Sequence, residues 1–326
     1  MFPATVPMAT RPITLGQVRG FLLEEYERAF RHDHWHVGIV DAPIHAFLEP
    51  DAKFDVHWLP LPEQGKYYAD PFGLVRGGAA HILFEEFDYG TNRGIISWVR
   101  EEADGRFSAP TPALELPFHV SYPFLIEQAG SVYCVPETGE AHEIALYKAV
   151  EFPHRWAKAA TLVRGVAGVD NTIFKHDGRF WLFCTDLGDG PFSKLRVWYA
   201  PDLVGPWTPH PANPVKDDVR SARPAGTPFS VDGELYRPAQ DSSSTYGGAI
   251  VLNRIVTLTT TEYREEEVTT IGPFRDAPHT HGIHTLSSMG DRTLVDGKRF
   301  AFDGRAMARN LRESIGGRWP RALLAR

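Results

Sequence analysis

Short apolar segments alternate with glycine-containing turns along most of the chain, and this pattern recurs about every fifty residues. In each copy an apolar segment leads into a turn and a second apolar segment follows it, as in ADPFGLVRGGAAHILFEE. Five copies align on one turn glycine with spacings of 48 to 57 residues, at Gly78, Gly130, Gly178, Gly233 and Gly290. A period of roughly 40 to 50 residues is typical of the four-stranded blade of a β-propeller.

Third and fourth strands are predicted after each of these hairpins, for example in GIISWVRE and KLRVWYAP. Five such units occupy about residues 59–303. The pattern therefore predicts an all-β fold, a five-bladed β-propeller with short helical appendages at its N- and C-terminal ends.

The appendages are expected over residues 1–58 and 304–326. Apolar positions at helical spacing predict a helix over 15–31, and the strand-like stretch 34–40 is expected to complete a blade. Residues 304–326 carry six arginines on a predicted helix. A basic helix of this kind can contact a membrane surface or a partner, or simply pack on the propeller in solvent.

Composition excludes several classes of protein. Hydrophobic residues at 43% and charged residues at 23% indicate a globular chain with a substantial core. A net charge of −7 offers no positive field for a phosphate backbone, so no nucleic-acid partner is expected. No segment approaches the roughly 20 apolar residues of a membrane span, and the N-terminus lacks a leader pattern. We therefore expect a cytoplasmic protein.

Neither a metal nor a cofactor is predicted. Cys134 and Cys184 lie in apolar segments and indicate buried thiols, since two cysteines make neither a disulfide framework nor a four-cysteine zinc site. The histidines within 32–36 and 279–284 are two to three residues apart, a spacing that is weak evidence for zinc, so they are interpreted as loop or channel residues.

Equivalent residues of different blades form rings around a propeller axis, because the blades are related by rotation. Eight residues before the turn glycines stand Asp70, Tyr122, Asp170, Ala225 and a residue within 282–284. Seven residues after them stand Glu85, Glu137, Thr185 and Gln240, with Glu86 and Asp241 alongside and the fifth member open. A single aspartate here is explained by turn chemistry alone. Four recurring carboxylates repel one another, however, and this cost points to an axial functional site.

Several short sequence segments resemble those of a known family, and the resemblance spans about residues 35–300. They are Tyr68-Ala69-Asp70-Pro71-Phe72, Phe84-Glu85-Glu86-Phe87-Asp88-Tyr89, Ser121-Tyr122-Pro123-Phe124, Ala222-Arg223-Pro224-Ala225-Gly226 and Ala239-Gln240-Asp241. The chain resembles the five-bladed glycosidases of the arabinanase and β-xylosidase clan. It is more similar still to the glycosidase-like N-terminal domain of glucosamine inositolphosphorylceramide transferases. This resemblance does not carry over the lipid-glycosylating activity of those two-domain proteins, because no glycosyltransferase domain follows the propeller in this sequence.

The resemblance to the glycosidase clan implies a general base at Asp70. Tyr122 stands where that clan has a second aspartate, and Asp170 stands where that clan usually has the glutamate that serves as general acid. The general acid therefore stays open among Glu137, Glu85 and Glu86, with Asp70, Asp170 and Glu137 as the catalytic set. Inverting hydrolysis requires such a base and acid about 6.5 to 9.5 Å apart.

The other polar residues predicted in the axial pocket suit a sugar. Arg223, Gln240 and His284 can donate hydrogen bonds, Tyr122 can stack on a ring, and Glu85, Glu86 and Asp241 can accept. We expect a carbohydrate-active enzyme that cleaves or transfers a glycosyl unit on an intracellular glycoconjugate or surface-polysaccharide precursor. The alternatives are a glycosyltransferase of glycolipid or polysaccharide synthesis and a non-catalytic propeller that binds glycans or partners.

Overall fold

A computed structural model describes residues 32–50, 52–275, 278–305 and 307–309. The chain divides into two units, residues 33–299 and residues 1–32 with 300–326. The helix predicted over 15–31 lies outside the described residues, as does most of the helix predicted over 304–326. No helix within the described ranges is long and apolar enough to cross a membrane.

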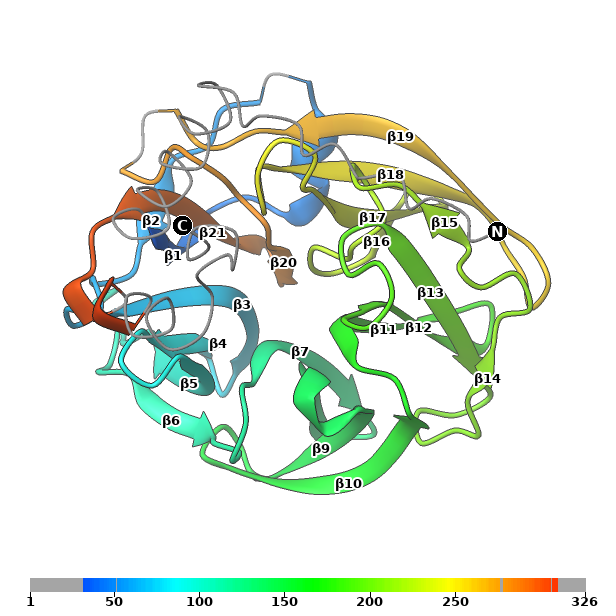
Figure 1. Ribbon diagram of the computed structural model, residues 1–326, viewed down its shortest axis with the longest axis horizontal. Coiled ribbons are helices and arrows are strands. Elements are labelled where there is room, and N and C mark those ends of the chain that lie inside the picture. The colour runs from blue at the N-terminus through cyan, green and yellow to red at the C-terminus, as the bar shows by residue number, and fades with distance from the viewer. Residues whose placement is uncertain (1–31, 51, 276–277, 306, 310–326) are drawn as a thin grey trace, which may run out of the picture. The chain divides into compact units, whose positions relative to one another are not determined.

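The unit of residues 33–299 is built from five antiparallel sheets around an axis, as predicted (Figure 1). The first blade contains β3 (Lys66–Arg76), β4 (Ala79–Asp88), β5 (Arg93–Arg100) and β6 (Thr111–Leu114). The second contains β7 (Ser121–Gln128), β8 (Ser131–Glu137), β9 (Glu143–Glu151) and β10 (Arg155–Arg164), with a short 3-10 helix η2 (Gly139–Ala141). The third contains β11 (Gly168–His176), β12 (Arg179–Asp186), β13 (Lys194–Ala200), β14 (Thr208–Pro209) and β15 (Lys216–Asp217). The fourth contains β16 (Phe229–Val231), β17 (Glu234–Asp241), β18 (Ala249–Leu258) and β19 (Tyr263–Ile271).

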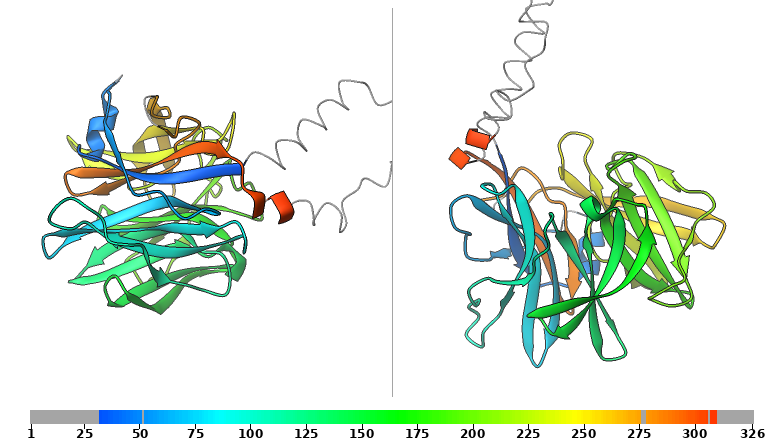
Figure 2. Two further views of the ribbon diagram at one scale, coloured as in Figure 1. Left: turned by 90° about the vertical axis from the view of Figure 1, so that its left-hand side faces the viewer. Right: turned by 60° about the horizontal axis from the view of Figure 1, so that its bottom comes forward.

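The fifth blade joins distant parts of the sequence. Its inner strands β20 (Leu286–Met289) and β21 (Arg292–Ala301) pair with β1 (His32–Val40) and β2 (Val56–Trp58), in the order β2-β1-β21-β20. Figure 2 shows the blue β1 lying beside the orange β21. The 3-10 helix η1 (Ile44–Leu48) connects β1 and β2. The strand predicted over 34–40 is thus β1, and it closes the ring of blades.

The turn glycines explain why the hairpins recur. In the first four blades both central residues of the inner hairpin turn have positive φ, and the aligned glycine is the second, with φ between 75° and 81°. Two positive φ angles define the turn whose twist matches paired strands. In the fifth blade Gly290 is the first turn residue instead, because Met289 pairs with Arg292.

This shift of one residue identifies the fifth member of the second ring, which the sequence left unassigned. Glu85, Glu137 and Thr185 pair with the residue just before each inner bulge. Lys298 occupies the equivalent place in the fifth blade, where it bridges to Gly282.

Apolar side chains fill the spaces between adjacent blades. Five separate clusters of buried residues lie at the five blade interfaces, including one around Ile82 and Val37 that joins the first and fifth blades. Cys134 and Cys184 are buried free thiols, as predicted. The strands β3, β7, β11, β16 and β20 each lie at one end of their sheet, next to the axis (Figure 1).

Candidate functional site

Three blades open with the same backbone distortion. Asp70 on β3, Tyr122 on β7 and Asp170 on β11 have φ of 52°, 45° and 52°, and the pairing with the next strand shifts register at each of them. Such bulges redirect a side chain, and the left-handed conformation is costly for a residue other than glycine. Strain retained at equivalent points of three blades marks this end of the axis as a functional candidate.

Asp170 lies at the centre of a buried polar network, and its side chain is 2% exposed. Its Oδ2 accepts hydrogen bonds from Nε of Arg223 at 2.5 Å and from Nε2 of Gln240 at 2.7 Å. Its backbone N–H donates to Oε2 of Glu137 at 3.3 Å. Arg223 also lies 5.1 Å above the ring of Tyr246. The predicted residues Asp170, Glu137, Arg223 and Gln240 therefore form one assembly.

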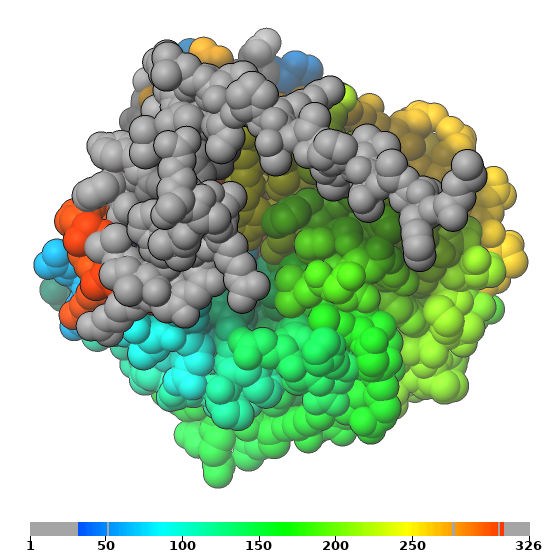
Figure 3. All heavy atoms as spheres, viewed as in Figure 1, coloured from blue at the N-terminus to red at the C-terminus, as the bar shows by residue number. Residues whose placement is uncertain are grey.

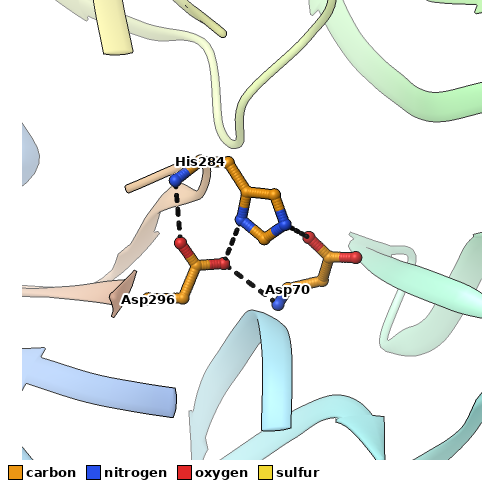
Figure 4. A group of neighbouring side chains, drawn as sticks. All are labelled: Asp70, His284 and Asp296. Atoms are coloured by element: carbon orange, nitrogen blue, oxygen red, sulfur yellow. Dashed lines mark hydrogen bonds and ion pairs between the residues drawn. The ribbon is translucent and has the colours of Figure 1, made fainter. Parts of the chain in front are cut away.

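Asp70 belongs to a second assembly with residues of the fifth blade (Figure 4). Its Oδ1 accepts a hydrogen bond from Oγ1 of Thr285 at 2.9 Å and lies 3.7 Å from Nε2 of His284. Its backbone N–H donates to Asp296, which also binds Nδ1 of His284 at 2.5 Å. The ring of His284 stacks on Trp35 with centroids 3.7 Å apart.

Electrostatics give the carboxyl groups different protonation states. Burial, reinforced by the charges of Asp170 and Asp296 and opposed by that of His284, raises the pKa of Asp70 to about 6. Burial and the charge of Asp170 raise the pKa of Glu137 to about 8, although Arg223 opposes the shift. Burial also raises the pKa of Glu85 well above its usual value. At pH 7 Asp70 is therefore mostly ionised, whereas Glu137 is mostly protonated.

Tyr122 is part of the scaffold and presents no ring face to a ligand. Its side chain is fully buried, packed edge-on against Phe72. Its hydroxyl oxygen accepts a hydrogen bond from the N–H of Gly226 at 2.6 Å and lies 2.9 Å from Oγ1 of Thr172. Gly226 is needed there, since a Cβ would meet the carbonyl oxygen of Leu286 at 1.9 Å. The interpretation of Tyr122 as a sugar platform is therefore corrected, because its bulged backbone turns the ring into the core.

Glu86 and Asp241 also lie outside the carboxyl cluster. Successive side chains of a strand point to opposite faces, so Glu86 points away from Glu85 and accepts hydrogen bonds from Lys66 and Ser97, each at 2.7 Å. Asp241 accepts bonds from the backbone N–H and hydroxyl of Ser243 in the loop after β17. Both side chains, predicted to bind a ligand, instead make hydrogen bonds to neighbouring residues of their own blades.

Asp296 and Thr285 were missed by the sequence interpretation. Asp296 lies in the strand segment Thr293-Leu294-Val295-Asp296, in which every residue is fully buried. A charged residue inside an otherwise buried strand was the available signal, because such a charge requires a partner.

The group of Asp70, His284 and Asp296 also has the spacing of a metal site, since its ligand atoms lie within 4.8 Å of one another. The oxygens of Asp296 nevertheless accept four hydrogen bonds, from the backbone N–H groups of Asp70, His284 and Thr285 and from the His284 ring. These donors stabilise the negative charge of the Asp296 carboxylate and occupy the oxygen lone pairs that a metal cation would need. The arrangement therefore fits a hydrogen-bonded relay better than a metal centre.

The network leaves acceptors available to a ligand. Oε1 of Gln240 and Oε1 of Glu85 are buried and receive no hydrogen bond from the residues that the structure describes. Nε2 of His119 lies 3.5 Å from Oε1 of Glu85. Unsatisfied buried acceptors are costly unless a ligand or water supplies a donor. Where grey atoms do not cover it, the face in Figure 3 is hollowed near the axis.

Two solved structures share the fold. Zg3597, a family 117 glycoside hydrolase of Zobellia galactanivorans, superposes with a TM-score of 0.52 and 12% identity, covering 85% of this chain and 91% of its own. The catalytic domain of the Coprinopsis cinerea GH62 alpha-L-arabinofuranosidase gives a TM-score of 0.51 and 17% identity, covering 72% and 82%. These similarities show the propeller architecture.

Relatives found by sequence share a higher identity with this chain than these two structures do. Glucosamine inositolphosphorylceramide transferase 1 of Oryza sativa subsp. japonica is 35% identical over 217 residues, which are 64% of this chain and 29% of that protein. The Arabidopsis thaliana protein of the same name is 36% identical over 208 residues, 62% of this chain and 27% of its own. The chain thus spans less than a third of the length of these relatives.

The family model described as "Glucosamine inositolphosphorylceramide transferase 1, N-terminal" matches residues 61–280. This chain belongs to the family of that N-terminal domain.

Proposed function

We propose that the axial carboxyl groups cleave or transfer a glycosyl unit, with inversion at the anomeric carbon. The observation that carries the proposal is the convergence of four buried carboxyl side chains, from three blades, on one end of the axis: Asp70, Glu85, Glu137 and Asp170. Burying several carboxyl groups together is costly, and paired groups with separated pKa values are how proteins run acid and base chemistry at one pH.

In the proposed reaction Asp70 is the general base. Its carboxylate accepts a proton from a water molecule or acceptor hydroxyl as that oxygen forms a bond to the anomeric carbon. Glu137 is the general acid, and its proton goes to the leaving oxygen as the glycosidic bond breaks. Burial and, after it, the charge of Asp170 raise the pKa of Glu137, so this acid keeps its proton at neutral pH.

Arg223 and Gln240 form the polar wall of the proposed sugar site. They hold Asp170 through Nε and Nε2, and the free Oε1 of Gln240 can accept a hydroxyl proton. A protonated Glu85 can donate to a second hydroxyl. These contacts suit a neutral, hydroxyl-rich ligand such as a glycoconjugate or polysaccharide precursor.

Of these two reactions, the names of the relatives favour glycosyl transfer. The same base then accepts the proton of an acceptor hydroxyl in place of water. The products distinguish the two reactions, because hydrolysis releases a free sugar and transfer yields a new glycoside.

The proposal is tested by the pH dependence of turnover on a panel of aryl glycosides. We expect kcat/KM to rise with pH through about 6, as Asp70 loses its proton, and to fall through about 8, as Glu137 loses its proton. As a control, Glu86→Gln should keep the same profile, since that carboxylate lies outside the cluster. Saturable glycan binding without turnover on any substrate would instead support a non-catalytic glycan-binding propeller.

A further inference from the structure

Asp296 is a fully buried carboxylate beside Asp70, and the proposed reaction gives it no role. It lies on β21, on the far side of the His284 ring from Asp70 (Figure 4). Its Oδ1 accepts the backbone N–H groups of His284 and Thr285 at 2.9 and 3.0 Å, and its Oδ2 accepts the N–H of Asp70 at 3.2 Å. One side chain therefore ties the backbone of Asp70 to the backbone of His284 and Thr285.

His284 lies between the two carboxylates. Nδ1 is 2.5 Å from Oδ2 of Asp296, and Nε2 is 3.7 Å from Oδ1 of Asp70. The ring stacks on Trp35 with planes 6° apart, and the edge of Tyr246 closes another side at 5.3 Å. These contacts prevent the imidazole from turning away. Burial lowers the pKa of His284, but the charges of Asp296 and Asp70 outweigh it and raise the pKa above the usual value.

We propose that Asp296 and His284 are positioning residues for Asp70, an inference that rests on the proposed function. Asp296 orients the imidazole and the backbone of Asp70. The resulting imidazolium directs one N–H at each carboxylate and favours the ionised form of Asp70. In this proposal His284 acts through Asp70 and is not a ligand of the sugar, the role predicted for it from the sequence. The His284 side chain is only 1% exposed, which agrees with a role inside the protein.

The groups around Asp70 explain why a cation beside this carboxyl group is needed. Burial and the charge of Asp170 on β11 favour the protonated form, whereas His284 and the hydrogen bond from Thr285 favour the ionised form. Among the residues that the structure describes, the other titratable or charged groups that act on the pair include Glu85 on β4, Glu137 on β8, Tyr67 on β3, Tyr246 between β17 and β18, and Lys298 on β21. Without the imidazolium, Asp70 would stay protonated to higher pH.

Asp296→Asn tests the inference through the acidic limb of the pH profile. His284 should lose its charge near neutral pH, and its influence on Asp70 exceeds that of the lost Asp296 charge. We expect the limb to move up by about one pH unit, which lowers kcat/KM about tenfold at pH 5.5 and less at pH 7.5. Thr293→Val on the same strand removes a buried hydrogen bond to Ala42 and should cost stability without moving the limb. An Asp296→Asn profile lowered equally at every pH would overturn the proposal.

A second readout does not depend on turnover. Nitrogen-15 NMR of the imidazole should show wild-type His284 protonated on both nitrogens at pH 7, and should show it neutral in Asp296→Asn. The carbon-13 signal of the Asp70 carboxyl group should titrate at higher pH in the variant. If the wild type turns over no glycoside but shows these shifts, the proposed function fails and the positioning network stands. A neutral His284 in the wild type, or signals that change on adding a chelator, would overturn the network itself.

Discussion

Asp70→Asn should lower turnover by about 10²- to 10⁴-fold while leaving folding and glycan binding nearly unchanged, because loss of a general base has an effect of this size. Asparagine tolerates the left-handed conformation that residue 70 adopts, with φ of 52°. It also keeps an oxygen to accept the hydroxyl of Thr285. What it loses is the ability to take a proton, so the deficit should appear in kcat with KM little changed.

Steady-state kinetics and a urea titration check this expectation together. Asp177→Asn is the matched control, since Asp177 has φ of 47° in the turn between β11 and β12, remote from the cluster. That variant should keep wild-type turnover. An Asp70→Asn protein with an undiminished rate would reduce Asp70 to a turn residue and move the base to another carboxylate.

Glu137→Gln should show a loss that depends on the leaving group. An amide cannot donate the proton that a poor leaving group requires, so turnover of alkyl or sugar glycosides should fall about 10²- to 10⁴-fold. An activated nitrophenyl glycoside needs no such proton, and its turnover should fall much less. The descending limb near pH 8 should also disappear, because the group that deprotonates there is gone.

The check is a series of aryl glycosides with leaving groups of graded pKa. Glu127→Gln, an exposed position on the same blade, should behave like the wild type throughout. If Glu137→Gln loses the same factor on every substrate, Glu137 is not the acid, and Glu85 becomes the candidate.

The sequence predicted the architecture because its signals are local. A glycine at a fixed point of each hairpin is required by the turn's positive φ, so the repeat is visible without an alignment of relatives. The fifth blade was harder to register, since Gly290 is the first residue of its turn and the other glycines are the second. That difference hid Lys298 as the fifth ring member.

The site was predicted less completely because side-chain direction depends on backbone detail. Ring positions brought Asp70, Asp170, Glu85 and Glu137 into one cluster. The same positions misplaced Tyr122, whose bulge turns its ring into the core. Asp296 has no counterpart among the ring acids, and only the folded structure shows that its side chain on β21 accepts the backbone N–H of Asp70 on β3.

The central claim is that the axial carboxyl groups act on a glycosidic bond, and a crystal structure of Asp70→Asn with a bound oligosaccharide tests it most directly. We predict the anomeric carbon between residue 70 and Glu137, with the leaving oxygen within hydrogen-bond reach of Glu137. The two carboxyl-derived groups should stand about 6.5 to 9.5 Å apart, the separation that inversion requires. A glycan bound away from the axis, or one whose anomeric carbon neither group can reach, would contradict the account.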